Sequence, residues 1–317
     1  MAGVNVPLLI IAFNRPTVLK RLLESLAQHR FKQLFVFVDH ERVGVPGEAE
    51  LVEECRELVR SIDFCDEKST NFATTNLGCG YGPFSAITWA FGNSKELIVL
   101  EDDCIPASSF FPFCAQLLAR YRDDQKVWMI SGNNFSEKNF DVPESYTFSG
   151  YAHFWGWATW KRSWQQVKYD REICLKELDR IPENRFLSEQ EREFFITDYR
   201  ANLLRKSDDL WDYQAALAMA LNDGLSIVPQ KNLVSNIGLH GTHFSSDKPF
   251  FKLASDPEFS VVTHPKTIER DRLYDRIHFE KHWQEINTRS LAEKLRTRWI
   301  KIRKFFSDWV RDPKNNE

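Results

Sequence analysis

Three adjacent carboxylates, Glu101-Asp102-Asp103, directly follow the apolar run 97–100. An apolar run of this kind is typical of a strand buried on both faces. Ligands of open α/β sheets bind beyond the carboxyl ends of the strands, where these three side chains would lie. Their mutual repulsion would be relieved by a divalent cation that also binds phosphate oxygens, Mn²⁺ or Mg²⁺. An acidic turn with a helix-capping aspartate is the alternative interpretation.

Two further apolar runs also end in polar residues. Asn14 and Arg15 follow the run 8–13, and Asp39 follows the run 34–38. Arg15 has the chemistry to bind a phosphate, and Asp39 could accept hydrogen bonds from a base or a ribose. Polar residues commonly begin loops, so the agreement of three strand ends is more informative than any one of them.

The elements that position these residues follow from hydrophobic periodicity. Buried strands are predicted at 8–13, 34–38, 97–100 and 127–132, with helices at 17–26 (capped by Thr17), 48–61, 84–91 and 109–121. Alternation of strand and helix indicates right-handed crossovers and a parallel sheet. Residues 71–82, rich in glycine, are expected to form a loop. Beyond residue 150 we expect an aromatic segment at 150–160, helical stretches at about 170–206 and 210–221, a short strand at 227–229, and a loop rich in Asn, Gly and His to about 250.

Composition limits the class of protein. The chain has 317 residues, 43% of them hydrophobic, and a formal net charge of −3. These values are ordinary for a folded soluble protein and argue against a nucleic-acid partner. Six cysteines without a CxxC pair favour a reducing compartment. The N-terminal apolar stretch is too short to span a bilayer, so we expect a first strand rather than a signal peptide.

The segment 289–311 differs from the rest of the chain. Its eight basic and two acidic residues are interleaved with large apolar residues at spacings of three and four, which is one face of a helix. Such a basic amphipathic helix could lie on an anionic membrane surface. A helix packed on its own domain with a solvated basic face is the alternative.

Seven segments follow one another along about residues 7 to 245: IIAFNRPTVLKRLLESL, VFVDH, LGCGYGPFSAITWAF, LIVLEDDCIPASSFFPF, VWMISGNNF, FWGWATW and LWDYQ. In this order they resemble the inverting GT-A glycosyltransferases of the N-acetylglucosaminyltransferase I type and related bacterial sugar transferases. The EDD triplet with FWGW and WD behind it is the specific part of the resemblance.

The resemblance implies an α/β fold of the GT-A type, with a mostly parallel central sheet flanked by helices. It implies a GT-A domain over 1–260, with a nucleotide-binding half at about 1–132 and an acceptor half at about 133–260. Residues 261–317 would form a C-terminal helical extension. Because no Golgi anchor precedes the domain, the expectation is a bacterial-type enzyme in the cytoplasm or at the inner face of the membrane.

The resemblance also assigns roles on the donor side of the site. Asp103 would be the direct metal ligand of a DxD-type motif, with Glu101 and Asp102 supporting the metal and the donor sugar or ribose. Asp39 would contact the uracil. Gly78 falls in the donor-side loop, and the glycines there would let the backbone approach the nucleotide closely. His240 and His243 follow near the end of the domain. His243 would reach the metal or close over the diphosphate, and polar surface is its alternative.

On the acceptor side, Asp212 falls where the family keeps its catalytic base. The alternative is that Asp212 begins a helix, where an acid suits the helix dipole. The pocket for the donor sugar and acceptor would be walled by Trp155, Gly156, Trp157 and Trp211. Trp155, Trp157 and Trp160 could instead be core residues. Trp155 replaces a smaller apolar residue of the animal enzymes, and Tyr213 replaces a second acid.

The expected activity is a single displacement that moves a sugar from a nucleotide-diphosphate donor, with UDP-sugars favoured, to a hydroxyl of a glycan or lipid-linked acceptor. This would serve the synthesis of a surface polysaccharide or glycolipid. The first alternative is a sugar-nucleotide nucleotidyltransferase. That enzyme would need a glycine-rich, basic loop where Asn14-Arg15-Pro16 stands. The second is a non-catalytic carbohydrate-binding protein of the same fold.

Overall fold

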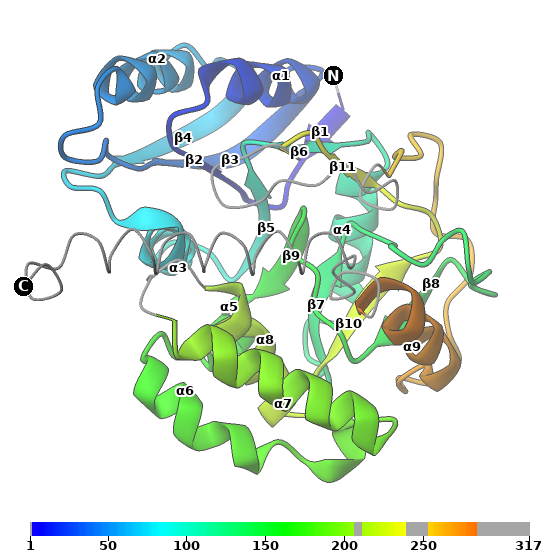
Figure 1. Ribbon diagram of the computed structural model, residues 1–317. Helices are drawn as coiled ribbons and strands as arrows, with labels where there is room; N and C mark the ends of the chain where they lie inside the picture. The colour runs from blue at the N-terminus through cyan, green and yellow to red at the C-terminus, as the bar shows by residue number, and fades with distance from the viewer. Residues whose placement is uncertain (1, 206–210, 239–252, 284–317) are drawn as a thin grey trace, which may run out of the picture.

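The computed structural model of the chain describes residues 2–205, 211–238 and 253–283. Its centre is a nine-stranded sheet in the order β1-β3-β2-β5-β9-β7-β10-β8, in which β4 also pairs with β3 (Figure 1). The strands are β1 (Ala2–Val4), β2 (Leu8–Ala12), β3 (His29–Val38), β4 (Cys65–Phe72), β5 (Glu96–Glu101), β7 (Val127–Ser131), β8 (Tyr146–Ser149), β9 (Trp157–Trp160) and β10 (Leu225–Pro229). Only β8 and β9 run antiparallel to their neighbours in this sheet. The expected α/β architecture with a mostly parallel sheet is therefore confirmed.

Helices connect and cover these strands. They are α1 (Pro16–Leu26), α2 (Glu48–Arg60), α3 (Gly78–Ala90), α4 (Phe110–Arg120), α5 (Lys161–Trp164), α6 (Arg171–Glu177), α7 (Glu189–Leu203), α8 (Asp212–Leu221) and α9 (Arg272–His278). The short 3₁₀-helices η1 (Leu178–Arg180) and η2 (Glu183–Arg185) and the π-helix η4 (Phe279–Trp283) complete them. A separate antiparallel pair is formed by β6 (Cys104–Pro106) and β11 (Val234–Asn236).

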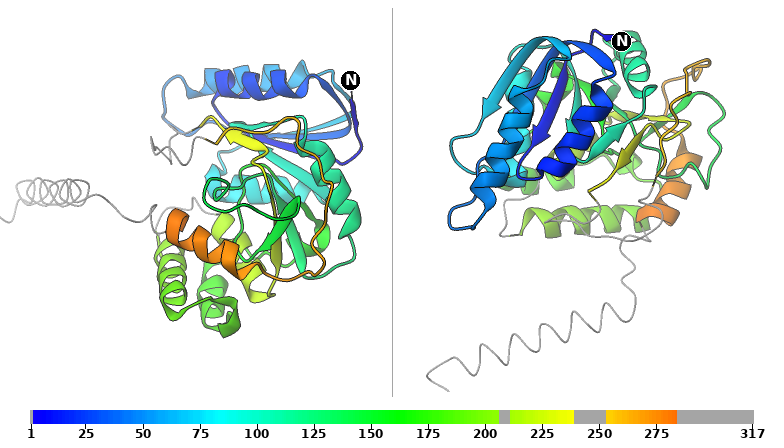
Figure 2. Two further views of the ribbon diagram at one scale, coloured as in Figure 1. Left: turned by 90° about the vertical axis from the view of Figure 1, so that its right-hand side faces the viewer. Right: turned by 90° about the horizontal axis from the view of Figure 1, so that it is seen from above.

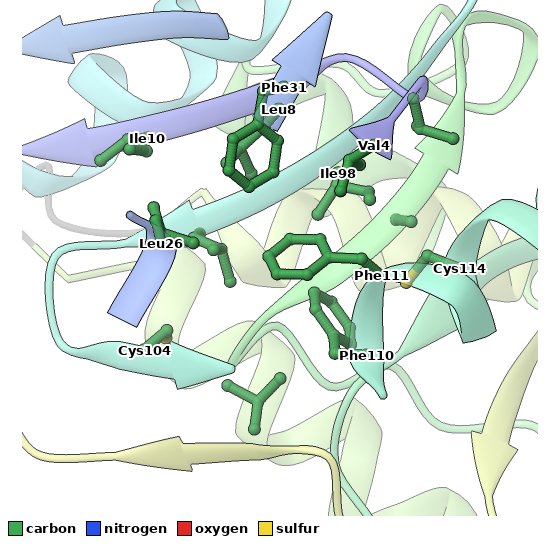
Figure 3. Packing of buried hydrophobic residues seen from close by; sticks show 14 of the residues in the cluster. Val4, Leu8, Ile10, Leu26, Phe31, Ile98, Cys104, Phe110, Phe111 and Cys114 are labelled. Atoms are coloured by element: carbon green, nitrogen blue, oxygen red, sulfur yellow. The ribbon is translucent and has the colours of Figure 1, made fainter. Parts of the chain in front are cut away.

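The sheet lies between two apolar layers because its strands alternate side chains between the faces. One face packs against α1, α2 and α4, and the other against α3 and α8 (Figures 1 and 2). In the first layer, Leu8 and Ile98 from the sheet lie with Phe110 and Phe111 from α4 (Figure 3). These central strands are buried along their length, which explains why their apolar runs are continuous.

The structure corrects three local predictions. Helix α1 begins at Pro16 rather than at a Thr17 cap, because proline suits the first helical position, where its missing N–H is not needed. The segment 65–72, for which the sequence predicts no element, is strand β4. It lies at the sheet edge and is mostly exposed, so it lacks an apolar pattern. Helix α3 begins at Gly78, well inside the predicted loop and six residues before Phe84.

The described residues 253–283 lie against the earlier part of the chain. Ser109 donates a hydrogen bond to the carbonyl of Asp256, Thr147 donates to Asp271, and Ser149 donates to Asp275 of α9. Helix begins there only at Arg272. The basic segment 289–311 lies outside the described residues. In the described ranges, no helix combines the length and the apolar character that crossing a membrane requires.

Candidate functional site

Three strand ends meet at one edge of the sheet, as expected. Ile11 of β2 is paired with Glu101 of β5, and Ala12 is paired with Val38 of β3. The parallel ladder continues one residue further on each side, because the amide of Asp39 donates to the Ala12 carbonyl at 3.0 Å and that of Asp102 to the Ile11 carbonyl at 3.0 Å. Asp39 and Asp102 therefore stand on either side of the end of β2.

Arg15 is the counter-ion of two carboxylates at this edge. Its guanidinium forms a bidentate pair with the buried Asp102 and lies 3.0 Å from Oδ2 of Asp103. Although burial lowers the pKa of Arg15, the two aspartates raise it above its ordinary value. The sequence predicts that a divalent cation relieves the carboxylate repulsion and that Arg15 binds a phosphate. In the structure Arg15 itself relieves part of that repulsion.

Residues 236–238, much later in the sequence, hold Asp103 in place. Strand β11 pairs with β6, and this brings Asn236 within reach of Asp103, to whose Oδ1 its side-chain amide donates at 3.1 Å. The amide of Ile237 donates to the carbonyl of Asp103 at 2.9 Å. Gly238 follows so closely that a Cβ atom there would lie 1.9 Å from Asp103 Oδ2. The sequence predicts no role for these three residues. His240 and His243, a few positions later, lie outside the described residues.

Glu101 links the strand end to Asp212. Part of Glu101 is accessible to solvent, yet burial is the largest cause that raises its pKa, to about 8. The charges of Asp103, Asp102 and Asp212 raise it further, and Arg15 opposes them. Asp212 is the first residue of α8 and lines a cleft of about 190 Å³. The carboxylates of Glu101 and Asp212, 111 positions apart in sequence, thus act on each other electrostatically.

The carboxylate of Asp39 is already saturated with protein donors. Its Oδ1 accepts from the amides of His40 and Leu77 at 2.8 and 2.9 Å, and its Oδ2 accepts from the Gly78 amide at 2.9 Å and the Asn76 side chain at 3.3 Å. Burial raises the pKa of Asp39, and these backbone hydrogen bonds oppose the rise. Asp39 therefore fixes the start of α3, where Gly78 takes the left-handed φ of 73° that suits glycine.

Asn14 belongs to a polar group that sequence reasoning missed. Its side-chain amide donates at 2.8 Å to Glu48, the buried first residue of α2. Glu48 also pairs with Arg42, whose side chain lowers the pKa of Glu48 although burial opposes this. The group closes the loop 39–47 over the end of β2. Acidic residues commonly begin helices, and nothing in the sequence singled out Glu48.

The tryptophans lie mainly in the core. Trp157 and Trp211 are buried and stack with a centroid distance of 5.8 Å, and Trp160 is also buried. Trp155 is half-buried, with its ring 5.2 Å from that of Phe135. Gly156 has a φ of 69°, and a Cβ there would lie 2.7 Å from Val234. Trp211 thus anchors the start of α8 beside Asp212, and Gly156 allows β11 to pass close to the sheet.

A divalent cation with phosphate ligands fits the donor set at this edge. Within the described ranges, no three side chains of His, Cys, Asp or Glu are grouped so as to hold a metal by themselves. Magnesium-type ions, however, are commonly bound through one or two carboxylates and completed by substrate phosphates and water. Oδ1 of Asp103 accepts from the Asn236 side chain at 3.1 Å and from the Cys104 thiol at 3.6 Å. Oδ2 lies 3.0 Å from the Arg15 guanidinium, which leaves a lone pair on Oδ2. The four carboxylates of Glu101, Asp102, Asp103 and Asp212 also outnumber the guanidinium of Arg15 that acts on them.

Comparison with solved structures concerns the fold. The mannosyltransferase PcManGT from Pyrobaculum calidifontis, in complex with GDP-Man and Mn²⁺, is 12% identical, with 70% of each chain covered and a TM-score of 0.39. The inositol-1-phosphate CTP transferase from T. maritima is 12% identical over 54% of this chain and 76% of that chain, with a TM-score of 0.29. An apo UDP-glucose pyrophosphorylase is 9% identical over 74% and 93% of the two chains, with a TM-score of 0.35.

No protein-family model and no curated protein matches the chain. The expected fold class is confirmed as a mixed α/β fold with a mostly parallel central sheet flanked by helices. The similarities above are too distant to carry an argument about the reaction.

Proposed function

We propose that the chain is a metal-dependent inverting glycosyltransferase that moves a sugar from a nucleotide-diphosphate donor, with UDP-sugars favoured, to an acceptor hydroxyl. The observation that carries this proposal is the effect of Asp212, at the start of α8, on Glu101, at the end of β5, whose pKa the charge of Asp212 helps to raise. It joins the carboxylates of the sheet edge to a carboxylate that lines a cleft. A donor diphosphate at the first and an acceptor hydroxyl at the second would meet between them.

On the donor side, Asp103 would hold Mn²⁺ or Mg²⁺ together with the diphosphate, and Asp102 and Arg15 would keep Asp103 in place. The bound ion would neutralise charge that develops on the departing diphosphate. Asp39 would act through the start of α3, because its oxygens are occupied by backbone donors. Asn14 would hold the loop 39–47 through Glu48.

On the acceptor side, Asp212 would accept the proton of the attacking hydroxyl as that oxygen bonds to the anomeric carbon. The bond from the anomeric carbon to the diphosphate oxygen breaks in the same displacement, so the configuration inverts. The resemblance favours Asp212 over a simple helix-starting role, and its place in the cleft supports the same choice.

The test is turnover of UDP-sugars with and without Mn²⁺, followed as UDP release and as glycoside formation. Asp103→Asn should abolish metal-dependent UDP release. Asp212→Asn should lower transfer by about 100-fold or more while donor binding persists. Asp123→Asn, at an exposed position, is the matched control. Formation of UTP from UDP-sugar and pyrophosphate, without transfer, would favour the nucleotidyltransferase. No turnover of either kind, with sugar binding retained, would favour the non-catalytic alternative.

We also propose that the segment 289–311 brings the enzyme to the inner face of the membrane, where a lipid-linked acceptor would be available. Its basic amphipathic sequence supports this proposal. Deleting 289–317 should abolish binding to anionic liposomes and leave binding of UDP unchanged. Unchanged liposome binding would contradict the proposal.

A further inference from the structure

Helix α8 separates two cavities. Asp212 and Met219 line the cleft of the proposed acceptor side, whereas Gln214 and Leu217 line a second pocket of about 240 Å³. This division follows from helical geometry, because residues two positions apart lie on nearly opposite faces of a helix. The other walls of the second pocket come from α6, η1 and the segment 166–168. A ligand in this pocket would therefore lie apart from the proposed reaction.

Gln214 is a buried carboxamide without a protein partner. The residue is 1% exposed, and neither its Oε1 nor its Nε2 forms a hydrogen bond with any described residue. A buried polar group that is left unpaired costs free energy, so such groups almost always have a partner in the protein, in water or in a ligand. Because Gln214 lines the second pocket, an occupant of that pocket can supply a donor for Oε1 and an acceptor for Nε2.

Two more carboxamides, Gln166 and Asn222, line the second pocket and are exposed. The Asn222 side chain donates to the carbonyl of Ala218 at 2.9 Å, so its Oδ1 can accept from a ligand. None of the described residues that line this pocket is aromatic, and a nucleobase would therefore lack a surface on which to stack. Neighbouring hydroxyls of a sugar ring fit better, because each hydroxyl can both donate to and accept from a carboxamide.

The charged side chains of the second pocket leave an excess of positive charge. Nζ of Lys168 and Nη1 of Arg180 lie 2.8 and 3.3 Å from the same oxygen, Oε1 of Glu177. Glu177 carries the one carboxylate among the described lining residues, so it offsets one of the two cations. The side chains of Lys168 and Arg180 are 52% and 73% exposed, so both can reach an arriving anion.

We infer that the second pocket binds a single sugar ring that carries a negative charge, such as a sugar phosphate. Two neighbouring hydroxyls would pair with Gln214, one donating to Oε1 and the other accepting from Nε2. The anion would lie beside Lys168 and Arg180. A volume of about 240 Å³ is below the usual range for drug-sized ligands, which suits one ring better than an oligosaccharide. This inference does not depend on the proposed function.

The experiment compares the 6-phosphates of glucose, mannose and galactose with the three parent sugars and with inorganic phosphate. Binding to the full chain is measured by calorimetry in EDTA, so that no divalent ion contributes. At least one sugar phosphate should bind about tenfold more tightly than both its parent sugar and inorganic phosphate, with the gap narrowing at high salt. Inorganic phosphate that binds as tightly as every sugar phosphate, or no binding by any of them, would overturn the inference.

Gln214→Leu tests the buried carboxamide. Leucine has a similar size and no polar atoms, so without ligand the Tm should rise, because an unpaired buried amide has been removed. The affinity for the sugar phosphate that binds the wild type should fall about tenfold or more. Gln190→Leu, at an exposed position on α7, is the control and should keep that affinity. A lower Tm with unchanged affinity would show that Gln214 already has a partner, and the inference would be wrong.

The two cations provide a test that does not depend on the folding of Gln214→Leu, because both are exposed. Lys168→Gln and Arg180→Gln should each weaken binding of the sugar phosphate about threefold or more and leave the affinity for the parent sugar unchanged. Lys176→Gln, which removes an exposed cation of α6 that does not line the pocket, is the matched control and should change neither. Unchanged binding of the sugar phosphate in both variants would place the anion elsewhere and refute the assignment.

Discussion

Arg15 and Asp102 form a bidentate ion pair that joins the end of β2 to the end of β5, with the aspartate buried and the arginine side chain 31% exposed. The same guanidinium lies 3.0 Å from Asp103. One cation therefore holds two carboxylates together at the rim where a diphosphate is proposed to bind. Removal of the arginine leaves a buried aspartate without its partner.

Arg15→Ala should lower the free energy of unfolding by about 2 kcal/mol at pH 7.5, less than for a fully buried pair because Arg15 is partly exposed. The loss should be smaller at pH 5.5, since burial raises the pKa of Asp102 to about 6 and its protonation removes the unpaired charge. Urea denaturation measures both values. Arg21→Ala, at an exposed position on α1, is the control. Equal losses at the two pH values would contradict this account.

The carboxylate cluster should make stability depend on pH in the absence of metal. Glu101 has a pKa raised from 4.5 to about 8, so the folded state binds its proton more tightly than the unfolded state does. Stability contributed by the protonated group is then lost as pH rises through 8. In EDTA, the Tm of the wild type should fall more between pH 6.5 and 8.5 than that of Glu101→Gln. Identical slopes for the two proteins would show that Glu101 is not responsible.

Added Mn²⁺ should reduce this dependence, because a cation beside Asp103 stabilises the ionised carboxylates. The Tm of the wild type at pH 8.5 should rise with Mn²⁺ concentration, and more so with UDP present, since binding to the folded state stabilises it. Asp103→Asn should lose the Mn²⁺ response. A response that persists in this variant would place the cation elsewhere.

The sequence predicted the parts of the fold that depend on buried, regular elements. The strands β2, β3 and β5 have continuous apolar runs because both of their faces are covered, and their shared polar ends followed from the geometry of a parallel sheet. Strand β4 was missed because an exposed edge strand needs no apolar pattern. The start of α3 was missed because glycines normally break helices, and here Asp39 satisfies the amides at that end.

The candidate site was predictable only where its chemistry is local in sequence. The triplet at 101–103 stood out because three carboxylates are adjacent. Contacts between distant segments carried no such signal: Asn236 reaches Asp103 through the β6–β11 pairing, and Asp212 acts on the charge of Glu101 although it lies 111 positions later. Arg15 was predicted to bind a phosphate, but its protein partners depend on the register of β2 against β5.

Asp39→Asn tests whether Asp39 positions the start of α3. The substitution turns one acceptor oxygen into a donor that faces backbone N–H groups, so at least one buried hydrogen bond is lost. The free energy of unfolding should fall by about 2 kcal/mol. Asp63→Asn, exposed and without a comparable role, should have almost no effect. If Asp39→Asn were as stable as the wild type while UDP binding was lost, the residue would act on the nucleotide directly.

Gly238→Ala isolates the contact between β11 and the carboxylate at the rim. The added Cβ would lie 1.9 Å from Oδ2 and 2.6 Å from Cγ of Asp103, so the carboxylate or the segment after β11 must shift. Because the proposed ion depends on Asp103, the Mn²⁺ concentration that gives half-maximal UDP release should rise about tenfold or more, with only a small change in Tm. Gly3→Ala, where a Cβ meets nothing within 4 Å, is the matched control. An unchanged Mn²⁺ requirement in Gly238→Ala would mean that Asp103 does not hold the metal, and the donor side of the proposed reaction would have to be reassigned.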